Sequence, residues 1–318
     1  MLRILNVEPE NYSREAYSIL CQLGQVDETP LSRQALLDQL PLYDVLITRL
    51  GHQIDQEVLA RGNKLKAVVS ATTGLDHIDT DYAAQQNIAV LCLRGEVDFL
   101  RSIPATAEHT WGLLLALIRR LPWAFQSVKD GAWDRDAFRG RDLYGKRLGI
   151  LGYGRIGTIV ARYALAFGME VLAYDPTPLE PNDAITFLPT MSALLRQSDI
   201  LSIHVPLNES TIGLISSAEF AQLPQGALLI NTSRGAIVDE DAMLASLISG
   251  HLGGAATDVL ADERIQNKDQ LSPLILYARE NDNLLITPHI GGATADSMAM
   301  TEIFMARKLQ RFLTAPSQ

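Results

Sequence analysis

Three residues with charged or ionisable side chains follow apolar segments in the second half of the 318-residue sequence. Arg234 comes after LLINTS, Glu263 comes soon after GAATDV, and His289 comes after NLLITP. Each residue taken alone is more simply an ordinary surface residue, because charged side chains usually lie in solvent. Together, at the ends of predicted strands, they suit a ligand site with acid-base chemistry, since open parallel sheets bind ligands beyond the carboxyl ends of their strands.

A glycine pattern in LGILGYGRIG predicts a dinucleotide-binding turn. Gly152, Gly154 and Gly157 stand in GxGxxG spacing between an apolar segment and the predicted helix RIGTIVARYALAFG. The first glycine permits a tight turn, the second lets a pyrophosphate approach the backbone, and the third lets the helix and the strand pack closely. Glycine-rich turns are common, so the pattern gains its weight from the strand, helix and acidic residue around it.

The acidic residue is Asp175, which ends the next predicted strand, EVLAYD. Its carboxylate can accept hydrogen bonds from the adenosine ribose hydroxyls. The same charge would repel a 2′-phosphate, and the following PTPLEP contains no Arg or Lys to neutralise one. The sequence therefore favours NAD over NADP.

Short apolar segments alternate with amphipathic segments along the whole chain, which predicts parallel sheets covered by helices on both faces. In the first hundred residues, strands are predicted at RILNV, DVLITR, KAVVSAT and AVLCL. Helices are predicted at SRQALLDQL and DTDYAAQQN, with Ser32 and Asp79 as N-caps. Six later strands, at RLGILG, EVLAYD, DILSIHV, GALLINTS, GAATDV and NLLITPH, indicate a complete dinucleotide-binding domain.

Two further helices are predicted from apolar residues at helical spacing. Residues 106–120 are expected to form one long helix that bridges two domains and is stopped by Pro122. Residues 293–313 form another helical pattern, which follows the last predicted strand and is expected to pack back on the first domain.

Composition excludes several classes of function. The chain has 27 Lys and Arg against 37 Asp and Glu, and a net charge of −10 does not favour nucleic acid as a partner. Cys21 and Cys92 show no metal-ligand spacing and suit a reducing compartment without structural disulfides. The N-terminus does not resemble a signal peptide, and the longest apolar stretch is shorter than the ~20 residues that a bilayer requires. We therefore expect a cytoplasmic protein without a membrane segment or a metal site.

The segments GKRLGILGYGRIG, SIHVPLNEST, NTSRGAIVDE, AATDVLADE and TPHIGGAT resemble the D-isomer-specific 2-hydroxyacid dehydrogenase family, which includes phosphoglycerate dehydrogenase and glyoxylate/hydroxypyruvate reductase. The resemblance implies an α/β fold with two Rossmann-like or flavodoxin-like domains, each with a parallel sheet, and an active site in the cleft between them. Residues 104–290 would form the NAD-binding Rossmann domain, and residues 1–103 with 291–318 the substrate domain. The implied reaction moves a hydride between NAD(H) and a small D-2-hydroxy acid or 2-oxo acid, in a homodimer.

The resemblance also implies roles for the three polar residues. Arg234 would bind the substrate carboxylate and polarise the 2-oxo group, which suits the planar fork of a guanidinium. His289 would be the general acid/base, and Glu263 would orient its imidazole and stabilise the charged form. With these residues, the substrate-binding set is Thr73, Gly74, Leu75, Arg234 and His289, where backbone N–H groups of the TTGLDHID turn would hold the carboxylate.

Asp258 would hold the nicotinamide carboxamide. Residues 204–206 would line the adenosine side of the cofactor, and simple packing is an alternative role for them. The full implied cofactor-binding set is Gly152, Gly154, Arg155, Ile156, Gly157, Asp175, His204, Val205, Pro206, Thr232, Asp258 and His289. Arg49 stands where phosphoglycerate dehydrogenases carry an arginine near the substrate phosphate, and a solvated strand-end arginine is an equal alternative. The neighbouring pairs Asp76–His77 and Glu108–His109 are interpreted as structural.

The chain departs from the family pattern after Glu263, where Arg264 replaces the usual proline and a long charged loop to residue 283 is predicted. Glu263 is thus identified mainly by its distance from Asp258. A C-terminal regulatory domain is not expected, because the sequence ends soon after TPHIGGAT. Formate dehydrogenase is disfavoured by Glu263, since that enzyme normally has glutamine there. The alternative outside enzymes is an NAD-sensing co-repressor of the same fold.

Overall fold

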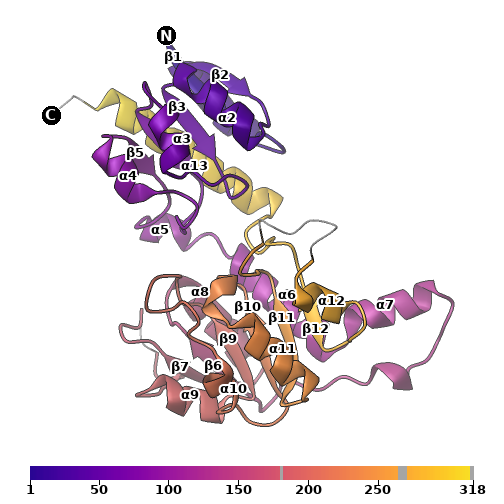
Figure 1. The fold of residues 1–318 in the computed structure, drawn as a ribbon. Coiled ribbons are helices and arrows are strands. Elements are labelled where there is room, and N and C mark those ends of the chain that lie inside the picture. The colour runs from indigo at the N-terminus through magenta and orange to yellow at the C-terminus, as the bar shows by residue number, and fades with distance from the viewer. Residues whose placement is uncertain (180–181, 264–270, 316–318) are drawn as a thin grey trace. The chain divides into compact units, whose positions relative to one another are not determined.

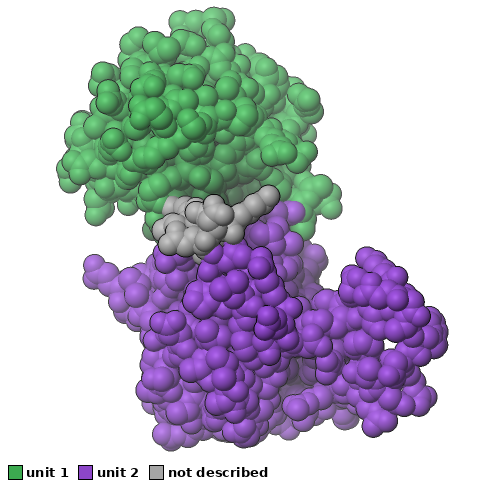
Figure 2. Space-filling model, turned by 45° about the vertical axis from the view of Figure 1, so that its right-hand side comes forward, with its two compact units in different colours: residues 1–102, 294–318 green, residues 103–293 purple. Residues whose placement is uncertain are grey.

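The computed structural model describes residues 1–179, 182–263 and 271–315. The chain divides into two compact units (Figures 1 and 2), namely unit 1 with residues 1–102 and 294–318, and unit 2 with residues 103–293. Each unit contains its own parallel sheet with helices packed against it. The predicted α/β class is therefore correct for both halves of the chain.

Unit 1 contains a five-stranded parallel sheet in the order β2-β1-β3-β4-β5. The strands are β1 (Leu2–Asn6), β2 (Gly24–Glu28), β3 (Val45–Thr48), β4 (Ala67–Ser70) and β5 (Ala89–Leu91). The helices are α1 (Arg14–Leu23), α2 (Arg33–Gln39), η1 (Leu40–Leu42), α3 (Gln56–Arg61), α4 (Thr80–Gln85), α5 (Val97–Leu100) and α13 (Ala295–Thr314).

Both helix N-caps predicted in unit 1 are confirmed. Ser32 and Asp79 cap α2 and α4, because their side chains accept hydrogen bonds from the amides of Ala35 and Tyr82. Strand β2 was not predicted; its sequence GQVDE is mostly polar, and it pairs with β1 at the edge of the sheet. Such a strand lacks the apolar alternation on which strand prediction depends.

Helix α13 packs in unit 1, as predicted for the C-terminal helical pattern. Its Phe304 stacks on Phe99 with the ring centroids 4.0 Å apart. Its Lys308 donates to the Glu96 carboxylate at 2.6 Å and to the Cys92 carbonyl at 2.8 Å. The last helix of the chain therefore completes the fold of the first hundred residues.

Unit 2 contains a seven-stranded parallel sheet in the order β12-β11-β10-β9-β6-β7-β8. The strands are β6 (Arg147–Leu151), β7 (Glu170–Tyr174), β8 (Thr186–Phe187), β9 (Ile200–Ile203), β10 (Ala227–Asn231), β11 (Leu252–Thr257) and β12 (Leu284–Ile286). The helices are α6 (Ala105–Ile118), α7 (Leu121–Lys129), η2 (Asp136–Phe138), α8 (Arg155–Ala166), α9 (Met191–Gln197), α10 (Ser217–Phe220), η3 (Gly235–Ile237), α11 (Glu240–Ile248) and α12 (Pro273–Ala278). The strand order reverses on either side of β6, which is the arrangement of dinucleotide-binding folds.

Alternating residues of the unit 2 strands feed two separate hydrophobic cores. On β10, Leu228 and Ile230 belong to the core that includes α6 and α8, whereas Ala227 and Leu229 belong to the core that includes α9 and α11. A strand with both faces covered must be apolar throughout, so ALLI is a continuous apolar run. All six strands predicted for this unit are present, and β8 adds a seventh of two residues.

Three predictions about connections were wrong. The helix predicted over 106–120 ends at Ile118, and Pro122 lies in the first turn of the next helix, α7, which begins at Leu121 after Arg120 in a left-handed conformation with φ 55°. Helix α6 also lies wholly within unit 2, so it does not bridge the units. The predicted long loop over 263–283 contains α12 in its second part, with Ser272 as N-cap, while residues 264–270 lie outside the described residues.

No helix in the described part of the chain is both long and apolar enough to cross a membrane.

Candidate active site

The predicted site residues of unit 2 all follow carboxyl ends of strands in one parallel sheet. Because parallel strands end at the same edge, the loops that follow them lie together along that edge. The residues, with the strands they follow, are Asp175 (β7), Gly152 (β6), His204 (β9), Arg234 (β10), Asp258 and Glu263 (β11), and His289 (β12). The glycine loop follows β6, between β9 and β7 in the sheet, and the acid/base candidates follow β11 and β12 at one end of the sheet.

The glycine loop has the geometry that a dinucleotide requires. Gly152 adopts φ 96°, and a Cβ on it would come within 2.7 Å of the His204 carbonyl carbon. A Cβ on Gly157 would come within 2.2 Å of the Gly152 carbonyl oxygen, so α8 and β6 pack closely only without a side chain there. Gly154, the N-cap of α8, has open space where its Cβ would be. The loop thus presents free backbone at a helix N-terminus, which fits the pyrophosphate of NAD.

Asp175 closes the same loop from the end of β7. Its carboxylate accepts hydrogen bonds from the amides of Tyr153 and Thr177, both at 2.8 Å. Each carboxylate oxygen can accept more than one hydrogen bond, so the half-buried Asp175 keeps capacity for further donors such as ribose hydroxyls.

The neighbouring residues Arg155 and Ile156 open helix α8. The Arg155 side chain donates to the Ile103 carbonyl at 3.0 Å, and burial lowers its pKa below the ordinary value for arginine. Ile156 packs against the core beneath α8. Both side chains have partners within the protein, and it is their backbone that lies at the helix N-terminus.

The loop after β9 is held by internal hydrogen bonds. The His204 Nε2 lies 2.8 Å from the Ser202 hydroxyl, and burial lowers the pKa of His204 to about 3, so this imidazole is neutral. The Ser233 hydroxyl donates to the Val205 carbonyl, while Pro206 is exposed. These contacts fix the loop beside the glycine turn.

Thr232 has a partner on a distant helix. Its hydroxyl lies 2.7 Å from the Thr110 hydroxyl of α6, and both side chains are buried. The end of β10 is thus tied to α6.

The acid/base candidates form a close pair. The His289 Nδ1 lies 2.6 Å from a Glu263 carboxylate oxygen, with the side chains 22% and 31% exposed. Because a carboxylate only accepts, Nδ1 carries the proton of this hydrogen bond. Nε2 is then the ring nitrogen that can exchange a proton with a substrate. His289 has φ 55°, an uncommon conformation for a residue other than glycine.

Arg234 lies at the start of η3, after β10. Its carbonyl accepts a hydrogen bond from the Asn231 side-chain Nδ2 at 3.0 Å, and its Nη1 donates to the Ser233 carbonyl at 2.8 Å. The next residue, Gly235, approaches the backbone after β11 so closely that a Cβ would lie 2.0 Å from the Leu260 carbonyl carbon. This glycine packs the loop of Arg234 against the segment that leads to Glu263.

Asp258 is a buried carboxylate whose two oxygens accept several hydrogen bonds. Oδ1 accepts from the Thr287 hydroxyl at 2.6 Å and the Ile290 amide at 2.9 Å, and Oδ2 accepts from the Gly291 amide at 2.7 Å. The His109 Nε2 lies 3.2 Å from Oδ1 and 3.0 Å from the Thr287 hydroxyl. Burial acts to raise the pKa of Asp258, but these hydrogen bonds outweigh it and hold the pKa below the ordinary value.

His109 and Thr287 belong to this site, although their local sequence does not predict it. The two residues are 178 positions apart, and only the packing of α6 beside β11 and β12 brings them together. A motif search cannot find such a pair, because neither residue belongs to a local spacing.

The substrate-binding residues predicted in unit 1 lie in the turn after β4. The Thr72 hydroxyl donates to the Gly74 carbonyl at 2.8 Å, Leu75 is buried, and Thr73 is half-buried. His77 is buried with its Nε2 3.3 Å from the Ser70 hydroxyl, in keeping with its structural interpretation. Any contact of this turn with a substrate stays a prediction.

Arg49 has several partners inside unit 1. Its Nη2 donates to the carbonyls of Glu8 and Glu10 at 2.7 and 2.8 Å, and its Nη1 lies 3.7 Å from the Glu302 carboxylate. The Arg49 side chain is 22% exposed, so it is not the solvated strand-end arginine of the alternative, and a contact with a substrate phosphate stays a prediction.

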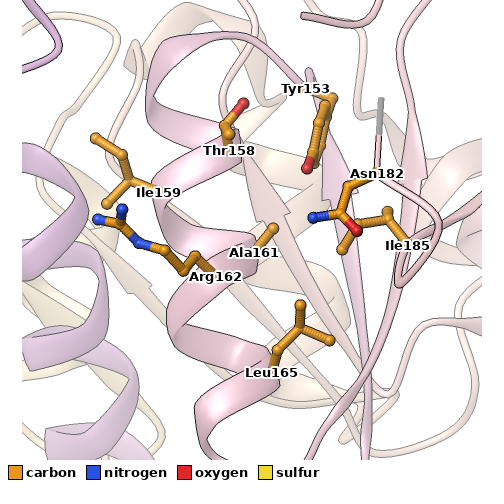
Figure 3. A pocket seen from close by; sticks show the side chains of 8 residues that line it. All are labelled: Tyr153, Thr158, Ile159, Ala161, Arg162, Leu165, Asn182 and Ile185. Atoms are coloured by element: carbon orange, nitrogen blue, oxygen red, sulfur yellow. The ribbon is translucent and has the colours of Figure 1, made fainter. Parts of the chain in front are cut away.

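A cavity of about 180 Å³ lies against one side of helix α8. Figure 3 shows its lining side chains, which are Tyr153, Thr158, Ile159, Ala161, Arg162, Leu165, Asn182 and Ile185. It contains none of the predicted catalytic residues. Within residues 1–179, 182–263 and 271–315, no cluster of three or more His, Cys, Asp or Glu side chains could hold a metal ion.

Residues 111–291 match the NAD-binding domain of the D-isomer specific 2-hydroxyacid dehydrogenases. The chain belongs to this family. It is 35% identical over 298 residues to hydroxypyruvate reductase of Thermotoga maritima, covering 93% of this chain and 94% of that protein. It is 34% identical over 317 residues to D-3-phosphoglycerate dehydrogenase of Methanocaldococcus jannaschii, covering 98% of this chain and 58% of that protein.

The solved structure of D-lactate dehydrogenase from Aquifex aeolicus, in complex with NAD and lactic acid, has a TM-score of 0.85 at 28% identity and covers 98% of this chain and 95% of that one. The predicted family, two-sheet α/β fold and NAD-binding domain are thereby confirmed. The chain spans about half the length of the curated D-3-phosphoglycerate dehydrogenases it matches.

Proposed function

We propose that this family member reduces a small 2-oxo acid to the D-2-hydroxy acid with NADH and catalyses the reverse oxidation with NAD. The hydrogen bond of 2.6 Å between His289 and Glu263 carries the proposal, because it places an oriented imidazole at the sheet edge that also holds the dinucleotide loop. The bound nicotinamide supplies or accepts the hydride.

The protein's own residues supply the proton and the substrate contacts. In reduction, the His289 Nε2 gives its proton to the oxygen of the 2-oxo group, and Glu263 stabilises the imidazolium before transfer. Arg234 binds the substrate carboxylate and polarises the 2-oxo group through its guanidinium. In oxidation, neutral His289 accepts the hydroxyl proton at Nε2. Backbone N–H groups near Thr73, Gly74 and Leu75 remain our prediction for additional carboxylate contacts.

For the substrate class, an unphosphorylated acid such as hydroxypyruvate or glyoxylate is favoured over 3-phosphohydroxypyruvate. Arg49 already donates to two carbonyls and lies near Glu302, so a phosphate there would compete with those contacts and meet a carboxylate. The similarity to a protein named hydroxypyruvate reductase over most of both chains supports this choice.

A panel of 2-oxo acids with NADH tests the proposal, using hydroxypyruvate, glyoxylate, pyruvate and 3-phosphohydroxypyruvate. We expect turnover with at least one of the first three, and His289→Ala should lower the rate ~100-fold or more with NADH binding nearly intact. A chain that binds NADH but turns over none of these acids would instead favour the NAD-sensing co-repressor.

We also propose a homodimer that involves α6, α7 and the segment around Trp133. Helix α7 buries none of its residues within the chain and extends away from the rest of unit 2 (Figures 1 and 2). Phe125 is 66% exposed and Trp133 is 91% exposed. Apolar side chains gathered on a projecting segment are typical of an association surface.

Light scattering at micromolar concentration tests the dimer. The parent should have twice the chain mass, and the double variant Phe125→Ser/Trp133→Ser should have the mass of the monomer. A monomeric parent would contradict the dimer.

A further inference from the structure

His109 on helix α6 contacts the loop that carries His289 through one buried carboxylate. The Asp258 oxygens accept from Ile290 and Gly291, the two residues that follow His289, and from the hydroxyl of Thr287, two residues before it. The Asp258 carbonyl also accepts from the His289 amide at 2.8 Å. Asp258 therefore binds the chain on both sides of His289.

The backbone at His289 needs such support. A φ of 55° costs free energy for a residue with a Cβ, and such conformations persist where the surrounding contacts impose them. Gly291 allows the carboxylate to come close, since a Cβ there would lie 2.8 Å from Asp258 Oδ2 and 3.5 Å from the His109 ring. The imidazole direction of His289 thus depends on where the Asp258 carboxylate lies.

The hydrogen-bond directions assign a proton on His109. The Thr287 hydroxyl has one proton, and at 2.6 Å it goes to the ionised Asp258 carboxylate, which can only accept. The His109 Nε2 lies within reach of that hydroxyl oxygen and of Oδ1, so it must be the donor to them. Thr287, Ile290 and His109 then donate to Oδ1, and Gly291 donates to Oδ2.

We propose that His109 is a positioning residue for His289, acting through Asp258 and Thr287. The His109 Nε2–H holds the carboxylate in the orientation that grips the loop, and the loop in turn directs the His289 ring toward Glu263 and the substrate. The part of this proposal that concerns catalysis rests on the proposed function. The part that concerns the conformation of His289 does not.

Two substitutions and one control separate this role from a general loss of stability. His109→Gln keeps an N–H near the position of Nε2, whereas His109→Leu removes it. The control is His251→Leu, because His251 also makes side-chain hydrogen bonds within unit 2, to Phe220 and Gln225, in a different region. Reduction kinetics with the best 2-oxo acid, NADH binding and melting temperature are measured for all three variants.

We expect His109→Leu to lower kcat ~10-fold while the Kd for NADH changes less than twofold, because misalignment of the acid/base affects the transition state. His109→Gln should recover to within ~3-fold of the parent, and His251→Leu should match the parent. A parent-like kcat for His109→Leu would overturn the proposal. So would a tenfold weaker NADH affinity, because His109 would then act through the nicotinamide contact predicted for Asp258.

A second readout does not need turnover. In protein with 13C-labelled histidine, the ring signal of His289, one of six histidines, is assigned by its loss in His289→Ala. It should shift in His109→Leu and stay near the parent position in His109→Gln and His251→Leu. An unmoved signal would refute the positioning role even if no 2-oxo acid is a substrate, whereas a shifted signal in a protein without turnover would refute only the proposed function.

Discussion

Replacing Glu263 with glutamine removes the charge that faces His289 and leaves a side chain of almost the same shape. A hydrogen bond between charged groups contributes about 1.5–3 kcal/mol. The two side chains are 22% and 31% exposed, so solvent screens the pair, and we take about 1.5–2 kcal/mol. At 1.36 kcal/mol for each factor of ten, the reduction rate should fall ~10- to 30-fold under conditions where the imidazolium depends on Glu263.

The pH dependence distinguishes this mechanism from simple disruption. In the proposed mechanism carbonyl reduction requires protonated His289, whose charge Glu263 balances, so the loss in Glu263→Gln should be larger at alkaline than at acidic pH. The assay is kcat/KM against pH in both directions, followed by NADH absorbance.

Asp262→Asn is the matched control, because it removes the adjacent carboxylate and leaves Glu263 in place. This variant should stay within twofold of the parent across the pH range. An equal loss at every pH in Glu263→Gln, or a larger loss in Asp262→Asn, would show that Glu263 does not stabilise the imidazolium and that the charge comes from a different carboxylate.

Three further predictions concern the cofactor loop and stability. The parent should use NADH at least tenfold more efficiently than NADPH in kcat/KM, and Asp175→Ala should narrow that ratio; an unchanged ratio would assign the preference elsewhere. Gly157→Ala should weaken NADH binding at least tenfold and lower the melting temperature, because its Cβ would lie 2.2 Å from the Gly152 carbonyl oxygen, and calorimetry with NADH measures both. Burial raises the pKa of Glu302 above its ordinary value, although the carboxylate accepts a hydrogen bond from the Ser13 amide. Glu302 therefore stabilises the folded protein most at pH values below the pKa that it has in the unfolded chain. This stabilisation is lost as the pH rises through the pKa of Glu302 in the folded protein. The melting temperature of Glu302→Gln minus that of the parent should therefore be ~2 °C greater at pH 8 than at pH 4. A constant difference across that range would contradict the raised pKa of Glu302.

Much of the fold was evident in the sequence, because the fold depends on local patterns. Strands with both faces buried are continuous apolar runs, as in ALLI of β10, and helix starts are marked by capping residues such as Ser32. The glycine loop was equally evident, since its spacing follows from backbone sterics at Gly152 and Gly157. The polar edge strand β2 was missed, because it lacks this apolar signal.

The chemistry of single side chains was decided by the tertiary structure. The sequence could place Glu263 and His289 after neighbouring strands, but only the packing of β11 against β12 brings their atoms to 2.6 Å. His109 was interpreted as an ordinary structural histidine, because nothing in its local sequence predicts the carboxylate that α6 packs against. Secondary structure follows from neighbours along the chain, whereas hydrogen bonds between residues over a hundred positions apart depend on how the elements pack, and that is where the site acquires its geometry.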